Sequence, residues 1–383
     1  MLRGRCNTEE EAAREAKTGK KKDEAGRKRR DPPGSISCCP SVGGELTTAL
    51  RAKAGEVGRW LPGLALSLAA IFLLVRLADW SEVGGALAAV EITWLVPAIF
   101  CYLAGVFFRS LTWRTLLLNR ASLSQAFFKL NEGYLINNLF PLRLGELGRV
   151  LLLSQKSGLS AFFVLSTIVI ERAYDLAIAA LLLLATLPLV LNVGSSQAIA
   201  CGIAGAAGLG IILMFQLARS RERIQSRLRR MGVTNQFYQR RVLPWLDSLL
   251  AGLEVLTRVD RFVLSLGFIL LSWFFGAIEI HLLILSFGAP APFWWTGFAL
   301  GVVSLGIAVP SAPASLGVYE AAMVGALTVL GVSTAQALAI AILAHLIHIT
   351  STGLIGGIAL FRDGQTLTGV YRRLRAVRLP RDP

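Results

Sequence analysis

The sequence is poor in the patterns from which soluble enzymes build their active sites. It holds three His and five Cys, and none of them stands at the spacing of a zinc site. It also lacks a nucleophile elbow, a Walker phosphate loop and a dinucleotide-binding fingerprint. We therefore expect no metal and no cofactor.

Charged residues are scarce as well, at 16%, whereas hydrophobic residues make up 54% of the chain. Several apolar runs approach the ~20 residues that a helix needs to cross ~30 Å of hydrocarbon. An open sheet would leave backbone groups unpaired in lipid, and the alternating pattern of a membrane barrel is missing from the sequence. The sequence predicts an all-α, polytopic membrane protein with six to eight transmembrane helices.

The net charge of +15 is concentrated in three blocks, which are residues 1–31, residues 219–241 and the tail from Arg362 onward. Each block borders apolar sequence, as cytoplasmic loops do under the positive-inside rule, and such loops contact anionic lipid. The pattern favours membrane lipids over nucleic acid as partners and leaves a homo-oligomer open. We expect a multi-pass protein of the cell (inner or plasma) membrane with both termini in the cytoplasm.

The chain divides into three predicted regions. Residues 1–58 hold too little apolar surface to fold alone, which predicts a disordered basic extension. Residues 59–362 form the transmembrane domain, and residues 363–383 form a basic tail. The predicted full spans are 61–77 (extendable through Trp80), 92–108 (ending at Arg109), 160–191, 198–217, 262–287 and 335–361.

Two more apolar segments, 126–153 and 292–333, are interrupted and predict pairs of re-entrant half-helices. The first is broken at Pro141, and the second at Pro310 and Pro313. Broken helices are tolerated at membrane depth only where they are buried in protein or line a watery cavity. Both pairs are followed by a span that holds ionisable residues, so we infer an inverted repeat, which is typical of transporters with a site near the midplane.

The first break carries Arg143, Glu146 and Arg149 at spacings of three, which would place all three on one helical face. A carboxylate between two guanidinium groups is net positive, and Arg binds phosphate through two parallel hydrogen bonds. The motif could bind an anionic headgroup, or it could be an ion-pair cluster that only anchors the half-helix. The spacing leaves both interpretations open.

The following span places Glu171, Arg172 and Asp175 at about half the depth of the bilayer, at 1.5 Å per helical residue. Charges at that depth are costly in lipid. They predict either a polar network in a cavity or a structural ion pair.

The second break leads into a half-helix for which Ser315 is a candidate N-cap, and the free N–H groups there would suit an anion. Alternatively, Glu320 accepts hydrogen bonds from those N–H groups itself. His345 and His348 lie three residues apart in the last span. They fit either a proton-coupled role or hydrogen bonds between helices.

Together these motifs resemble the lysylphosphatidylglycerol synthase transmembrane (flippase-like) family over about residues 60–362. The sequence departs from the family at Ala314, where a Gly commonly follows the second Pro, and both Ala314 and Ser315 are less flexible than Gly. The residues that carry the resemblance are Asn138, Pro141, Arg143, Gly145, Glu146, Arg149, Glu171, Arg172, Asp175, Pro310, Pro313, Gly317, Glu320 and His345.

The resemblance implies a flippase or transporter that moves an anionic phospholipid, a glycolipid or a polyprenyl-phosphate sugar between leaflets, with these side chains in its substrate site. In that family the membrane unit can be fused to a soluble aminoacyl-transferring domain, which this sequence does not show. We therefore expect no synthase activity. Two alternatives stay open, a membrane scaffold or accessory subunit of lipid or cell-envelope glycan synthesis, and an intramembrane transferase that uses the same carboxylates.

Overall fold

The computed structural model describes residues 61–141, 143–190, 251–288, 291–309 and 311–376, with isolated positions between 201 and 250. The chain divides into Met1–Gly55 and Glu56–Pro383, and every helix described below belongs to the second unit. The predicted extension 1–58, most of the predicted span 198–217 and Pro310 lie outside the described residues. The domain boundaries therefore stay predictions.

Within the described ranges the regular elements are all helices, as predicted. Four are long and apolar enough to cross a membrane, namely α5 (Ile92–Leu116), α8 (Ala161–Val190), α12 (Val259–Leu285) and α15 (Thr334–Arg362). Large apolar side chains such as Phe100, Leu354 and Phe361 are exposed on them, which suits contact with lipid. The protein is a polytopic, multi-pass membrane protein.

The first described helix, α3 (Leu61–Leu77), has the predicted bounds. Its predicted extension through Trp80 is wrong, because Trp80 begins α4 (Trp80–Ala88), which is bent by 85° from α3. Asp79 caps α4, since its carboxylate accepts hydrogen bonds from the Ser81 and Glu82 N–H groups. Counting the bent pair as one span gives five candidate spans in the described residues.

Helix α5 is longer than predicted. The expected end at Arg109 is wrong, because the helix continues to Leu116. Its polar side chains Ser110, Thr112 and Thr115 donate their hydroxyl protons to carbonyls four residues earlier, so they need no water. Arg109 therefore lies inside a span and not in a cytoplasmic loop.

The first predicted break is confirmed. Helix α6 (Leu123–Leu139) ends before Pro141, and α7 (Leu144–Ser157) returns along it. Gly145 permits the close approach, because a Cβ atom there would lie 1.9 Å from the carbonyl oxygen of Gly133. We call α6, the break and α7 the first hairpin.

The second break is confirmed too, with α13 (Trp294–Ala308), the 3-10 turn η3 (Pro313–Ser315) and α14 (Val318–Val329) forming what we call the second hairpin. The predicted N-cap at Ser315 is wrong. Gly317 occupies that place with a φ of 83°, a conformation that only Gly adopts without strain. Its N–H donates to Glu320 Oε2 at 2.7 Å, so the alternative interpretation of Glu320 is confirmed.

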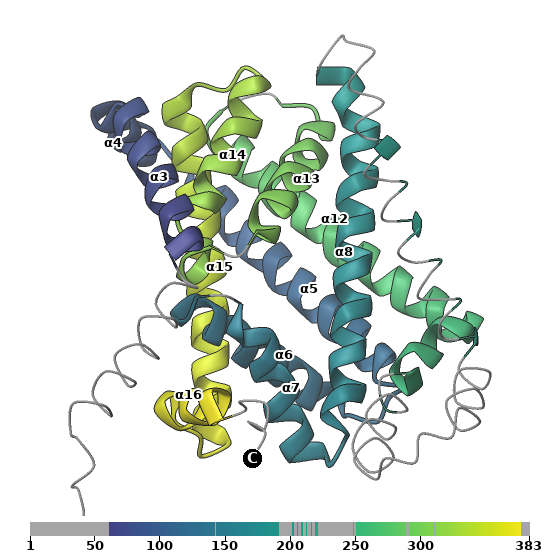
Figure 1. The fold of residues 1–383 in the computed structure, drawn as a ribbon. Coiled ribbons are helices and arrows are strands. Elements are labelled where there is room, and N and C mark those ends of the chain that lie inside the picture. The colour runs from purple at the N-terminus through teal and green to yellow at the C-terminus, as the bar shows by residue number, and fades with distance from the viewer. Residues whose placement is uncertain are drawn as a thin grey trace, which may run out of the picture. The chain divides into compact units, whose positions relative to one another are not determined.

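The two hairpins pack reciprocally, each against the long helix that follows the other. Helix α6 lies along the C-terminal half of α15, where Gly356 contacts the Asn131 backbone, and α13 lies along the C-terminal half of α8, where its Gly301 contacts Leu183 (Figure 1). The largest apolar cluster joins the second hairpin to α8 and α15, and another joins the first hairpin to α5 and α8. This exchange is what two copies of one unit would produce. That the copies are inverted stays a prediction.

Two short elements complete the described chain, the 3-10 turn η2 (Glu254–Thr257) before α12 and helix α16 (Leu367–Ala376) after α15. Tyr371 of α16 stacks on Phe140 at the end of α6, with ring centroids 4.9 Å apart. Asp363, between α15 and α16, contacts Lys129 and Lys156 of the first hairpin. The first hairpin is thereby attached to the C-terminal end of α15 by charged groups.

Candidate functional site

The break of the first hairpin is held by side-chain amides. Asn137 Oδ1 accepts a hydrogen bond from the Gly145 N–H at 2.7 Å, and Asn138 Nδ2 donates to Thr352 Oγ1 of α15 at 3.1 Å. Arg143 has a φ of 53°, a left-handed conformation that is uncommon outside Gly. The predicted site residues Asn138 and Arg143 thus lie at the turn itself.

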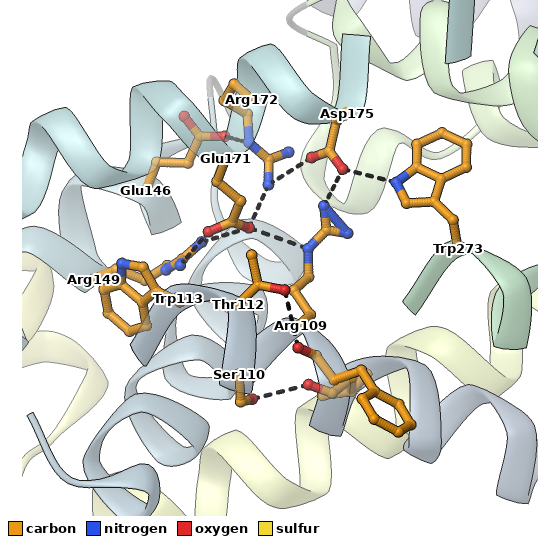
Figure 2. Close-up of polar contacts among 12 residues, drawn as sticks. Arg109, Ser110, Thr112, Trp113, Glu146, Arg149, Glu171, Arg172, Asp175 and Trp273 are labelled. Atoms are coloured by element: carbon orange, nitrogen blue, oxygen red, sulfur yellow. Dashed lines mark hydrogen bonds and ion pairs between the residues drawn. The ribbon is translucent and has the colours of Figure 1, made fainter. Parts of the chain in front are cut away.

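Glu171 of α8 is the centre of an ion network between helices (Figure 2). Its carboxylate accepts hydrogen bonds from Arg109 Nε at 3.1 Å, Arg149 Nη2 at 2.8 Å and Arg172 Nη2 at 2.9 Å. The Glu171 side chain is fully buried, and a buried charge is stable only when it is paired and hydrogen-bonded. The network predicted around this residue therefore exists, and it draws arginines from α5, α7 and α8.

Asp175 connects the network to α12. It contacts Arg109, lies 3.1 Å from Arg172 Nη2, and accepts a hydrogen bond from Trp273 Nε1 at 3.1 Å. Because Trp273 belongs to α12 and Arg109 to α5, Asp175 joins three helices (Figure 2).

Glu146 of α7, in the first hairpin, is also part of the network. Its Oε1 atom lies 3.6 Å from Arg172 Nε and 4.0 Å from Arg143 Nη1. The prediction that Arg143, Glu146 and Arg149 share one helical face is wrong, because Arg143 precedes α7. Arg149 instead binds Glu171, at 2.8 Å.

Arg149 is 2% exposed and lies over the Trp113 ring, with its guanidinium carbon 4.1 Å from the ring centroid. Trp113 Nε1 donates to Thr167 Oγ1 at 3.1 Å, which fixes the ring. A guanidinium that lies over an aromatic face gains a cation–π interaction in addition to its ion pair. The Nε–H of Arg149 is buried without a hydrogen-bond partner among the described residues.

Sequence reasoning missed Arg109, Trp113 and Trp273. A basic residue after an apolar run usually marks the cytoplasmic edge, so the sequence places Arg109 at the end of its span. A signal was nevertheless present, since the run Ser110–Leu117 after Arg109 is free of Gly and Pro and continues the helical pattern. Nothing in the sequence indicated which carboxylate Arg109 would meet.

The network has an excess of positive charge. Its cationic side chains are Arg109, Arg143, Arg149 and Arg172, and its carboxylates are Glu146, Glu171 and Asp175. The three carboxylates leave one guanidinium charge unbalanced. An anion is the ligand that would complete the balance.

The second hairpin presents a different kind of group. Glu320 Oε1 of α14 lies 2.5 Å from His345 Nδ1 of α15, and His345 Nε2 lies 2.9 Å from the Ala314 carbonyl oxygen. Ser67 of α3 fixes the same turn, because its Oγ accepts a hydrogen bond from the Ala312 N–H at 3.0 Å. The predicted residues Pro313 and Gly317 shape this turn.

A second carboxylate–imidazole pair lies beside the first. His348 Nε2 is 2.8 Å from Glu279 Oε1 of α12. Tyr102 of α5 stacks on His348 with ring centroids 4.3 Å apart, and Tyr319 stacks on His345 at 4.4 Å. Both histidines therefore form hydrogen bonds between helices, which was one of the two interpretations that the sequence left open.

A cavity of about 340 Å³ lies between the two hairpins. The two hairpins are connected at this cavity, since Arg143 Nη2 donates a hydrogen bond to the carbonyl oxygen of Ile307, near the end of α13. Glu171, Asp175 and Glu320 lie behind side chains of the wall to which they are hydrogen-bonded. Six of the predicted site residues line the wall, namely Asn138, Arg143, Glu146, Arg149, Arg172 and His345. Arg109, Glu279 and His348, which are outside the predicted site, also line it.

Among the described residues no group of three or more His, Cys, Asp or Glu side chains is placed to hold a metal ion. The arrangement offers guanidinium groups, imidazoles and carboxylates instead. These groups can bind an anion and exchange protons.

Residues 60–356 match the family model described as the lysylphosphatidylglycerol synthase TM region, a membrane domain of lipid or cell-envelope metabolism. Neither curated proteins nor solved structures gave a match to the chain.

Proposed function

Because the chain belongs to the lysylphosphatidylglycerol synthase transmembrane-region family, we propose that it moves a phosphate-bearing lipid between the leaflets of the membrane. The headgroup would pass through the cavity between the two hairpins. The transport step itself makes and breaks no covalent bond.

The observation that carries the proposal is the wall of arginines on that cavity. Arg109, Arg143, Arg149 and Arg172 all line it, although the surrounding helices are apolar enough to span a membrane. Guanidinium groups at such depth are costly unless they are paired, and here they outnumber the carboxylates of their network. A phosphate group offers the planar, bidentate partner that suits the remaining charge.

The size of the cavity indicates which part of a lipid enters. About 340 Å³ is near the lower end of the ~300–1,000 Å³ typical of small-molecule sites. It suits a phosphate with a small polar group but not two acyl chains. The chains would stay outside, along the exposed apolar side chains of the long helices.

The test is the movement of fluorescent lipids in proteoliposomes of the purified protein. We expect probes that carry phosphate, such as phosphatidylglycerol or a polyprenyl-phosphate sugar, to cross faster than a glycolipid without phosphate. Arg143→Asn should slow this movement by roughly ten- to a hundredfold, since a hydrogen bond to a charged group contributes about 1.5–3 kcal/mol. Asn is chosen because it tolerates the left-handed backbone at this position.

Arg258→Ala is the matched control, because Arg258 is exposed and pairs with Glu254 at the start of α12, away from the cavity. Glu171→Gln is unsuitable here, since it would leave the buried Arg149 without its carboxylate partner. Absence of movement with every probe, in protein shown to be folded, would contradict the proposal. It would favour the scaffold or accessory role instead.

A further inference from the structure

The hydrogen bonds of His345 require a proton between this residue and Glu320. A carbonyl oxygen can only accept, so His345 Nε2, at 2.9 Å from the Ala314 oxygen, must carry its proton. The other ring nitrogen, Nδ1, lies 2.5 Å from Glu320 Oε1. Two acceptors would repel each other at that distance, so a second proton lies between them. This hydrogen-bond geometry fits a pair that shares one proton.

The pair belongs to the same cavity as the arginines, because His345 lines the wall. The titratable groups that face it come from each neighbouring element. They are Tyr319 and Glu320 of α14, Glu279 of α12, Tyr102 of α5, Tyr134 of α6 and, on α15 itself, His348. Helix α4 packs on α15 through the apolar Val83. Of the facing groups, the Glu279–His348 pair is the other carboxylate–imidazole pair, and it would compete for the proton.

A proton on the pair changes the charge of the cavity by one. With the proton, the Glu320–His345 pair is neutral overall, and without it the pair is an anion. An anionic headgroup at the arginines is therefore favoured when the pair holds its proton. Because binding linkage is reciprocal, the headgroup must also favour the proton.

The two sites also act on one turn, the break of the second hairpin. Arg143 contacts it at Ile307, and His345 contacts it at Ala314 and through Glu320. If a headgroup phosphate displaced Arg143 from Ile307, the contacts of His345 with Ala314 and Glu320 would remain at this turn. Headgroup binding and protonation would therefore both act on the turn between α13 and α14.

We propose that the protein is a proton-coupled transporter, in which the Glu320–His345 pair takes up one proton as an anionic headgroup binds and returns it as the headgroup leaves. The inference rests on the proposed transport function. The proton comes from solvent, forms the N–H bond at His345 Nδ1, and goes back to solvent on release.

The experiment is calorimetric titration of the purified full-length protein with dioctanoyl phosphatidylglycerol, in pairs of buffers that differ in protonation enthalpy. The buffer-dependent heat counts the protons taken up per lipid. We expect a count that approaches one proton per lipid at a pH where the Glu320–His345 pair of the free protein has lost its proton. The affinity should fall as the pH rises, approaching tenfold per pH unit for one linked proton.

His345→Gln and Glu320→Gln, each checked for folding by gel filtration, should lose the proton uptake and flatten the pH dependence of the affinity. His281→Gln is the matched control, because His281 is the one His that does not line the cavity in the described residues, and it should keep both.

Binding without proton uptake at any pH would overturn the coupling and leave the headgroup site standing. Uptake that persists in both variants would overturn the assignment to this pair. If folded wild-type protein does not bind the lipid, the proposed function fails, and this inference fails with it.

Discussion

The two hairpins share a backbone design and differ in the charge that they carry. Each break contains residues other than Gly in the left-handed region, Arg143 in the first and Ala314 and Ser315 in the second. The first hairpin supplies permanently charged guanidinium groups, whereas the second supplies one carboxylate that is matched to an imidazole. Two hairpins of similar design thus yield a wall with fixed positive charge and a wall that carries a carboxylate–imidazole pair.

The difference also extends to how each hairpin is held. Apolar clusters pack both hairpins on their neighbours, but the first is also fixed by several ion pairs, whereas the second has only the Glu320–His345 pair among the described contacts. Because apolar packing does not titrate, we expect acid and charge-removing substitutions to affect the first hairpin more than the second.

The largest effect should come from removing the central carboxylate of the first site. Glu171→Gln leaves the buried Arg149 without its carboxylate and removes one partner from Arg109 and Arg172, so we expect a loss of about 3–5 kcal/mol in the free energy of unfolding. Glu320→Gln should cost only about 1–2 kcal/mol, because His345 can release its proton and remain neutral. Thermal unfolding in detergent measures both, and equal losses would contradict the contrast between fixed and titratable charge.

The next effect concerns the close approach within each hairpin. Gly145→Ala would place a methyl group against the Gly133 carbonyl, and overpacking of this kind costs about 1–3 kcal/mol. Gly325→Ala in α14 is the control on the second hairpin, because no atom lies within 4 Å of the added Cβ. It should be neutral or stabilising by up to about 1 kcal/mol. If both variants unfold at the wild-type temperature, the packing of α6 on α7 is looser than described.

A smaller effect of opposite sign is expected at the second break. Ser315 has a φ of 57°, and left-handed backbone costs about 1–2 kcal/mol in a residue that is not Gly. Ser315→Gly should therefore stabilise the protein, by about 1 kcal/mol or less once the greater freedom of Gly in the unfolded chain is subtracted. Ser304→Gly, inside helix α13, should destabilise it. Stabilisation by both, or by neither, would count against strain at this turn.

The smallest effect is a pH dependence at the base of the first hairpin. Burial opposes the charged form of Asp363, but hydrogen bonds from Lys129 and Lys156 outweigh it and hold its pKa below the ordinary value. A lowered folded-state pKa means that the stabilisation is complete above the unfolded value of about 3.9 and is lost as the pH falls through the folded value. We expect Asp363→Asn to lower the unfolding free energy by about 1 kcal/mol or less at neutral pH. The difference from wild type should vanish in strong acid, and a difference that persists there would show that the charge is not its cause.

The fold was largely predictable, because apolar length and Pro–Gly breaks are local properties of the sequence. The four long helices and both breaks followed from them, although α5 is longer than predicted and the predicted span 198–217 lies mostly outside the described residues. A charged network around Glu171 followed from the depth of the ionisable residues in its span. What remained hidden was set by contacts between distant segments. Arg109 looked like an interfacial residue until Glu171 and Asp175, more than sixty positions along the chain, supplied its partners. The choice of Gly317 over Ser315 as N-cap depended on a positive φ that residue type alone did not reveal.

The contact between Arg143 and Ile307 gives the arginine a second role, as a terminator of helix α13. Ile307 is among the last four residues of that helix, whose carbonyl groups have no partner within it. A cation there also interacts favourably with the negative end of the helix dipole. A phosphate that occupies Arg143 takes this stabilisation away. Ligand and helix end thus compete for one guanidinium, so binding of the headgroup would destabilise the last turn of α13.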